Sequence, residues 1–165
     1  IAEQLGVTAY NVFVWSPNSV SMPGTEANAM KNYYPGDMYV DWLGVSCYPP
    51  SLSATYPEER RYPLTLMQGI KQVSADKPIM ISEGGYSSTC DHQRWVREWF
   101  KLKDEEPRVK AVWENHENAE NGDRRLQSDP LALELYKELV QDPYWLDLIP
   151  DAVYSEIETR KNNSK

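Results

Sequence analysis

The stretch KPIMISEGG (residues 77–85) decides the fold, because it joins a buried strand to a carboxylate that packing does not require. Its three apolar residues, 79–81, are typical of a strand that is buried on both faces. Glu83 ends this strand, and the two glycines that follow leave room for a partner to approach its side chain. Glu83 is therefore a candidate catalytic residue. The alternative is a glutamate that a neighbouring arginine holds at a strand end.

Strand-like and helix-like patterns alternate along the rest of the chain. The strand-like runs start roughly 30 to 40 residues apart, a spacing that suits repeated βα units; they are Asn11 to Trp15, Val40 to Val45, Pro78 to Ser82 and Val109 to Trp113. Amphipathic helical patterns cover Pro63 to Val73, His92 to Lys103 and Leu131 to Val140. Asp129-Pro130 would begin the last helix with a capping acid and a proline in the first turn.

This alternation predicts an α/β fold, in which helices cover a parallel sheet. The sheet could be open and doubly wound or part of a (β/α)8 barrel, but no glycine-rich phosphate loop follows any strand, which disfavours the open sheet. Polar and aromatic residues follow the strands instead, where barrel enzymes keep their sites. These strand ends are Trp15-Ser16-Pro17-Asn18, Ser46-Cys47-Tyr48, Glu83-Gly84-Gly85 and Trp113-Glu114-Asn115. Four strands predict half of a barrel.

Composition narrows the class of partner. The 165 residues, of which 41% are hydrophobic, suffice for one core, and the formal charge of -8 argues against a nucleic acid or an anionic membrane surface. The 11 Tyr and 6 Trp outnumber the 2 Phe, which favours rings that stack and hydrogen-bond at a wet surface, as in a carbohydrate cleft. No stretch approaches the roughly 20 apolar residues of a membrane span.

The sequence predicts no metal and no cofactor. His92 and His116 lack the spacing of zinc ligands. The run Glu114 to Asp123 contains oxygen ligands that suit calcium, although a solvated loop is the commoner structure for such a run. Cys47 and Cys90 each follow a predicted strand, so that two separate thiols are expected and a disulfide is the alternative.

Four segments together resemble the later half of family 26 glycoside hydrolases: VFVWSPN (12–18), YYPGDMYVDWLGVSCY (33–48), KPIMISEGG (77–85) and KAVWENHENAENGDRRLQSDPLALELYKEL (110–139). The second segment is the most specific. The resemblance implies strands five to eight of a (β/α)8 TIM barrel and retaining, endo-acting hydrolysis of a β-linked polysaccharide such as β-1,4-mannan. We therefore expect a partial catalytic domain over residues 1–146 and a polar tail or linker over residues 147–165.

The same resemblance implies roles for individual residues. Glu83, ending strand seven, matches the nucleophile that forms a covalent glycosyl-enzyme intermediate. Tyr48, ending strand six, matches a tyrosine beside the nucleophile, and Trp113, ending strand eight, matches a tryptophan under the sugar at the cleaved bond. Trp15 and Asn18, ending strand five, are further substrate-binding candidates. The structural alternatives are a tyrosine packed under a loop, a core tryptophan and, for the last two residues, part of the barrel rim.

A retaining enzyme also needs a second carboxyl about 5 to 5.5 Å from the nucleophile. In family 26 this group ends strand four, usually as a glutamate after a histidine, and that strand would precede Ile1. His116-Glu117 mimics the pair but follows strand eight and aligns with a loop. The isolated chain is therefore expected to be an inactive fragment, and its two unpaired strand edges are expected to make it poorly soluble.

Two alternative functions stay open. The chain departs from the usual family pattern at Ser46-Cys47, Gly84 and Glu114, which bears on substrate preference. It could belong to a degenerate domain that binds carbohydrate without chemistry, or to another retaining barrel glycosidase, such as a mixed-linkage β-glucanase. The polymeric substrate that the resemblance implies would place the protein outside the cell as a secreted enzyme.

Overall fold

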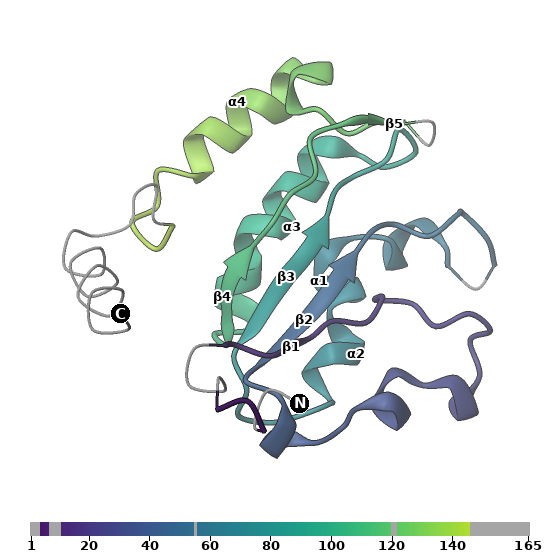
Figure 1. Ribbon diagram of the computed structural model, residues 1–165. Coiled ribbons are helices and arrows are strands. Elements are labelled where there is room, and N and C mark those ends of the chain that lie inside the picture. Colours follow the sequence, from purple (N-terminus) through teal and green to yellow (C-terminus); the bar gives the residue numbers. More distant parts are fainter. Residues whose placement is uncertain (1–3, 7–10, 55, 120–121, 146–165) are drawn as a thin grey trace.

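Four parallel strands form one sheet in the computed structural model of this protein (Figure 1). The structure describes residues 4–6, 11–54, 56–119 and 122–145. The strands follow one another across the sheet in chain order, as β1 (Val14–Trp15), β2 (Trp42–Cys47), β3 (Ile79–Gly84) and β4 (Val109–Val112). Parallel neighbours in sequential order are the arrangement of a (β/α)8 barrel, so the sheet has the architecture of part of such a barrel.

Helices cover one face of this sheet, behind the strands in the view of Figure 1. They are α1 (Pro63–Leu66), α2 (Gln68–Lys71), α3 (His92–Glu105) and, beyond α3, α4 (Pro130–Leu139). The helix predicted over Pro63 to Val73 divides at Met67, which forms the C-cap of α1 and the N-cap of α2. The predicted start of α4 is confirmed, because the Asp129 carboxylate accepts hydrogen bonds from the backbone of Leu131 and Ala132 at 3.0 and 3.1 Å.

A tyrosine-rich loop, residues 16–41, connects β1 and β2 in place of a long helix. It contains three short 3-10 helices, η2 (Glu26–Asn28), η3 (Met30–Tyr33) and η4 (Asp37–Tyr39). Pro23-Gly24 precedes η2, and Pro35-Gly36 separates η3 from η4, so proline and glycine bound this group of short helices. The remaining short elements are η5 (Glu58–Arg60), η6 (Leu126–Ser128) and the antiparallel pair β5 (Asn118–Ala119) and β6 (Gly122–Asp123).

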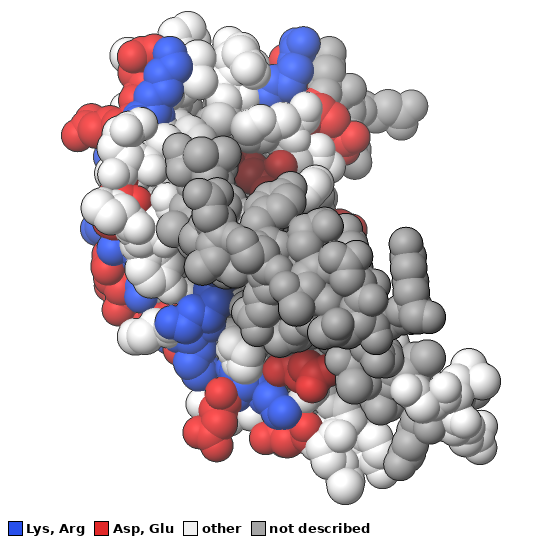
Figure 2. All heavy atoms as spheres, turned by 60° about the vertical axis from the view of Figure 1, so that its left-hand side comes forward, with Lys and Arg blue, Asp and Glu red and all other residues white. Residues whose placement is uncertain are grey.

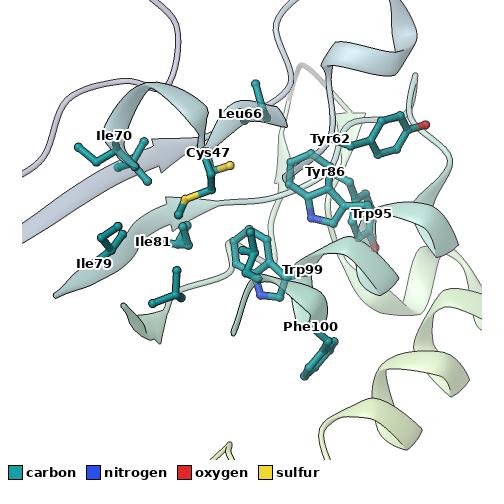
Figure 3. Close-up of a cluster of buried hydrophobic side chains, with 14 of the residues drawn as sticks. Cys47, Tyr62, Leu66, Ile70, Ile79, Ile81, Tyr86, Trp95, Trp99 and Phe100 are labelled. Carbon is teal, nitrogen blue, oxygen red and sulfur yellow. The ribbon is translucent and has the colours of Figure 1, made fainter. Parts of the chain in front are cut away.

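The core lies between the sheet and the helices (Figure 3). Alternate residues of the two central strands point toward the helices and are fully buried, namely Leu43, Val45, Cys47, Ile79 and Ile81. They meet a face of α3 that carries Trp95 and Trp99, whose stacked rings have centroids 6.0 Å apart. Burial raises the pKa of the Cys47 thiol. Cys47 and Cys90 are both free thiols, so the disulfide alternative is wrong.

The opposite face of the sheet, which we call the inner face, carries smaller and more polar residues. Val14 and Ser16 lie on it beside Gly44, because a Cβ atom added to Gly44 would lie 3.0 and 2.7 Å from their side chains. Val14 is 41% exposed. The inner face of this sheet is therefore available to a ligand or to further chain.

The surface carries both signs of charge. In Figure 2, acidic and basic side chains are interspersed over the described part of the face that the view presents. None of the described helices is long and apolar enough to cross a membrane. The predicted tail, residues 147–165, lies outside the described residues.

Gly84→Ala should destabilise the fold by about 1–3 kcal/mol, the usual cost of overpacking a core. A Cβ atom at Gly84 would meet the Trp99 ring, with Cζ3 at 2.8 Å, and that ring is buried between helix and sheet. Urea unfolding measures the loss. Gly24→Ala is the matched control, because its Cβ atom would meet nothing nearer than 3.7 Å. Equal stability of the two variants would contradict the packing described here.

Candidate functional site

An irregularity in the pairing of β2 and β3 turns Glu83 onto the inner face. Ser82 has no partner across the strands, so that Ser46 lies opposite Glu83 and the next residue of β2 lies opposite Gly84. Gly84 faces Trp99 on the helix-covered side. Glu83 therefore shares the inner face with Ser46, and its side chain is exposed. Bulges of this kind re-aim side chains next to active sites.

A hydrogen bond across β2 holds the bulge in place. The Ser82 hydroxyl bonds to the Ser16 hydroxyl, although a complete strand separates the two residues. This bond passes over Gly44, where a Cβ atom would lie only 2.8 Å from Ser16 Oγ. A residue with a side chain at position 44 would therefore obstruct the link between β1 and β3 just before Glu83.

Two residues that follow β4, Asn115 and Arg124, contact Tyr48, and Glu117 links the two. We call these four side chains the Tyr48 cluster. Asn115 Nδ2 donates hydrogen bonds to Tyr48 Oη at 3.3 Å and to Glu117 Oε1 at 3.1 Å. The Arg124 guanidinium lies 5.2 Å from the Tyr48 ring centroid, and its Nη1 donates to Glu117 Oε1 at 3.3 Å. Because the Tyr48 oxygen accepts the bond from Asn115, its own proton is available for another acceptor.

Gly85 lets the Tyr48 cluster pack against the end of β3. A Cβ atom at Gly85 would lie 3.1 Å from Arg124 Cδ, 3.3 Å from the Asn115 carbonyl oxygen and 3.6 Å from Tyr48 Cε1. The Asn115 backbone N–H also donates to the carbonyl of the last residue of β3 at 2.6 Å. The cluster is therefore attached at the carboxyl end of β3, next to Glu83.

Trp113 lies on the inner face and is 66% exposed, so it is not a core residue. Its backbone N–H donates to Ile81 O at 2.9 Å, which continues the pairing of β4 with β3. The preceding residue, Val112, packs against the core on the other side of the sheet. Alternation along the strand then directs the Trp113 ring to the same face as Glu83.

The two candidates at the end of β1, Trp15 and Asn18, lie two strands away from Glu83. Trp15 is half-buried, packs against the core and meets Tyr34 edge-on with ring centroids 5.1 Å apart. It therefore lies on the opposite face of β1 from Ser16. Asn18 is exposed and forms a parallel bridge with Ser46, which in turn lies opposite Glu83. The structure thus brings Tyr48, Trp113, Asn18 and Glu83 to one edge of the sheet, with Trp15 turned toward the core.

A buried acid follows Trp113 on the helix-covered side. The Glu114 side chain is only 7% exposed, and its Oε2 lies 3.5 Å from His116 Nε2. This carboxylate raises the pKa of His116. Burial, with the charge of Glu114 as a second cause, raises the pKa of Tyr136 on α4. The His116 ring meets the Tyr136 ring edge-on with centroids 6.4 Å apart, and so connects the segment after β4 to α4.

The geometry offers no metal centre within the part of the chain that the structure describes. No three side chains of His, Cys, Asp or Glu come together there in a group that could hold a metal ion. The run predicted as a possible calcium loop, Glu114 to Asp123, includes residues 120 and 121, which lie outside that part. What the site does offer is a carboxylate, an aromatic ring and a phenol at the carboxyl ends of adjacent strands.

Comparison with known proteins supports the fold. No protein-family model matches the chain, and no curated protein sequence matches it. A solved structure, the Cellulomonas fimi endo-beta-1,4-mannanase double mutant, is similar to it with a TM-score of 0.53 and 19% identity. The match covers 86% of this chain and 33% of that chain, so this chain spans about a third of the neighbour's length. Because the identity is only 19%, this likeness concerns the fold alone. It supports a fold like that of part of the mannanase barrel.

Asn115 and Tyr48 should be energetically coupled. A double-mutant cycle of Asn115→Ala and Tyr48→Phe, measured by urea unfolding, should give a coupling free energy of about 0.5–1.5 kcal/mol, the usual net contribution of one hydrogen bond. Asn115→Ala combined with Tyr33→Phe is the control, because no hydrogen bond joins those side chains. The effects of these two substitutions on the free energy of unfolding should be additive. Additivity of the first pair would rule out the Tyr48 cluster as described.

The pair of Glu114 and His116 should make stability depend on pH. Because the folded pKa of His116 is raised, its contribution is complete below the ordinary histidine pKa of about 6.5 and is lost as pH rises through the folded value. The melting temperature of the wild type should therefore fall as pH rises above about 6.5. His116→Gln and Glu114→Gln should both flatten this slope, and an unchanged slope in either variant would refute the pairing.

Proposed function

We propose that this chain supplies strands five to eight of a (β/α)8 barrel that hydrolyses a β-linked polysaccharide, with β-1,4-mannan as the first candidate substrate. The observation that carries the proposal is the bulge at Ser82, which turns the Glu83 carboxylate onto the inner face at the carboxyl end of β3. The exposed ring of Trp113 follows the neighbouring strand on the same face. The likeness to an endo-mannanase fold supports the same reading.

Glu83 would act as the nucleophile of a retaining mechanism. One carboxylate oxygen forms a bond to the anomeric carbon while the glycosidic bond breaks, and the leaving oxygen takes a proton from a second carboxyl. Water then attacks the glycosyl-enzyme, gives its proton to that second group and releases Glu83. We assign the second carboxyl to strand four of the barrel, which these residues do not include. Catalysis therefore requires more of the barrel than this chain.

The neighbouring residues would orient the reactants. The Tyr48 proton, which is not used toward Asn115, can be donated to the Glu83 carboxylate or to the sugar. The Trp113 ring offers an apolar face on which the sugar ring stacks. Glu117 is less suited to the acid role, because its Oε1 already accepts hydrogen bonds from Asn115 and Arg124. We also propose that residues 1–146 form the catalytic portion and that the enzyme acts outside the cell, where its polymeric substrate is found.

One observation favours a second function, carbohydrate binding without hydrolysis. Within the described residues the Glu83 carboxylate has no hydrogen-bond or ion-pair partner, whereas a nucleophile is normally oriented by donors. A domain that retained Trp113 and Tyr48 for stacking would bind the polysaccharide and leave it intact. The two functions differ in whether Glu83 becomes covalently attached to sugar.

Covalent labelling should therefore identify Glu83 as the nucleophile. A fluorinated β-mannoside with a dinitrophenolate leaving group reacts without protonation of that group, so the label does not depend on the second carboxyl. Peptide mass analysis should find one sugar on Glu83 and none on the Glu83→Gln variant. Glu117→Gln is the matched control and should still be labelled. A sugar found on any other residue would exclude this role for Glu83.

Turnover provides the complementary measurement. Joined to the remaining strands of the barrel, the protein should cleave β-mannan or a mixed-linkage β-glucan, and Glu83→Ala should abolish cleavage while retaining binding of the polysaccharide. Azide should partly restore turnover in Glu83→Ala and release a glycosyl azide of inverted configuration, because it replaces the missing nucleophile. Binding without cleavage by the wild-type full barrel would favour the second function.

A further inference from the structure

A cleft of about 220 Å³ lies between the end of β1 and the tyrosine-rich loop. The strand end contributes Trp15, Ser16 and Asn18, and the loop contributes Asn28, Met30 and Tyr33. None of its lining residues is charged, although the chain has 25 acidic and 17 basic residues. By contrast, the cleft between α3 and α4 is lined by several charged side chains, among them Arg97, Lys101 and Asp104. An uncharged ligand therefore suits the cleft at β1.

The aromatic ring at the mouth of this cleft is held in place before any ligand arrives. Tyr33 is 62% exposed, yet its hydroxyl donates a hydrogen bond to Asn28 Oδ1 at 2.7 Å. Asn28 is fixed in turn, because its Nδ2 donates to Pro23 O at 2.9 Å. A ring that is exposed but already oriented loses little conformational freedom on binding, which favours affinity.

The rest of the lining supplies both polar and apolar contacts. Asn18 is exposed, and among the described residues its side chain has no hydrogen-bond partner, so its amide can donate and accept. Met30 is buried at the apolar side of the cleft. Hydroxyls that meet amides and a C–H face that meets an aromatic ring are the two requirements of a neutral sugar.

The cleft lies on the same edge of the sheet as Glu83. Asn18 forms its bridge with Ser46, and Ser46 lies opposite Glu83. Adjacent strands are about 4.8 Å apart, so two strand spacings put the Asn18 backbone roughly 10 Å from that of Glu83. One polysaccharide chain with a bond at Glu83 can therefore place another of its sugars in this cleft.

We propose that the cleft is a remote subsite for a neutral sugar of the polysaccharide, in which the Tyr33 ring stacks on the sugar and Asn18 binds its hydroxyls. This inference rests on the proposed function and extends it to the tyrosine-rich loop. The subsite contributes affinity for long chains and takes no part in the chemical step.

Calorimetric titration with mannohexaose and cellohexaose tests the proposal, with Glu83→Gln as the background to prevent cleavage. Tyr33→Ala should weaken binding of the preferred hexaose about tenfold, as expected for loss of an aromatic anchor. Tyr33→Phe keeps the ring and should weaken binding of the hexaose less than about threefold. Tyr39→Ala is the matched control, because Tyr39 is 67% exposed on η4 and does not line the cleft. This variant should bind the hexaose with unchanged affinity.

Several outcomes would overturn the inference. These are unchanged affinity in Tyr33→Ala, an equal loss in Tyr39→Ala, absence of binding by both hexaoses, and equally tight binding of an anionic oligogalacturonate. Melting temperatures of all variants verify that each is folded. Labelling of Glu83 together with unchanged affinity in Tyr33→Ala would reject the subsite alone. An unlabelled Glu83 together with Tyr33-dependent binding would reject the hydrolytic function and leave the subsite in place.

Discussion

The close approach of Trp99 to Gly84 is the contact on which the geometry of this protein depends. The indole of Trp99 occupies the space where any other residue at position 84 would carry a side chain. Gly84 must therefore face the helices, and the extra residue, Ser82, lies before it in β3. The residue between them, Glu83, is left facing the opposite side. A core contact on one face of the sheet thereby orients a carboxylate on the other.

The same coupling between faces extends along the edge of the sheet. Ser82 reaches Ser16 over Gly44 of β2, and Gly85, just after β3, admits the Tyr48 cluster, so two glycines make room for polar contacts that cross the sheet. Each of these contacts joins elements that are distant in the sequence. The site is consequently a property of the assembled sheet, and no single strand or loop would form it in isolation.

The sequence was sufficient to predict the strands and helices, and it also predicted the edge of the sheet at which the site lies. Apolar runs located all four strands, and Asp129-Pro130 located the start of α4, because both signals are local. The bulge was not predictable: strict alternation from Ile79 and Ile81 would have directed Glu83 toward the helices. Asn115 and Arg124 were missed for a similar reason, since their partner Tyr48 lies 67 residues before Asn115.

The surplus of tyrosine and tryptophan illustrates why composition predicts a function less well than position does. Trp95, Trp99 and Tyr62 are fully buried, so part of the surplus only fills the core. Trp113 and Tyr33 are more than half exposed, at the carboxyl ends of strands or in the loop beside them. Burying them would have stabilised the fold, since aromatic rings remove large apolar areas from water. Their exposure at one edge is therefore better explained by a ligand with an apolar face than by folding.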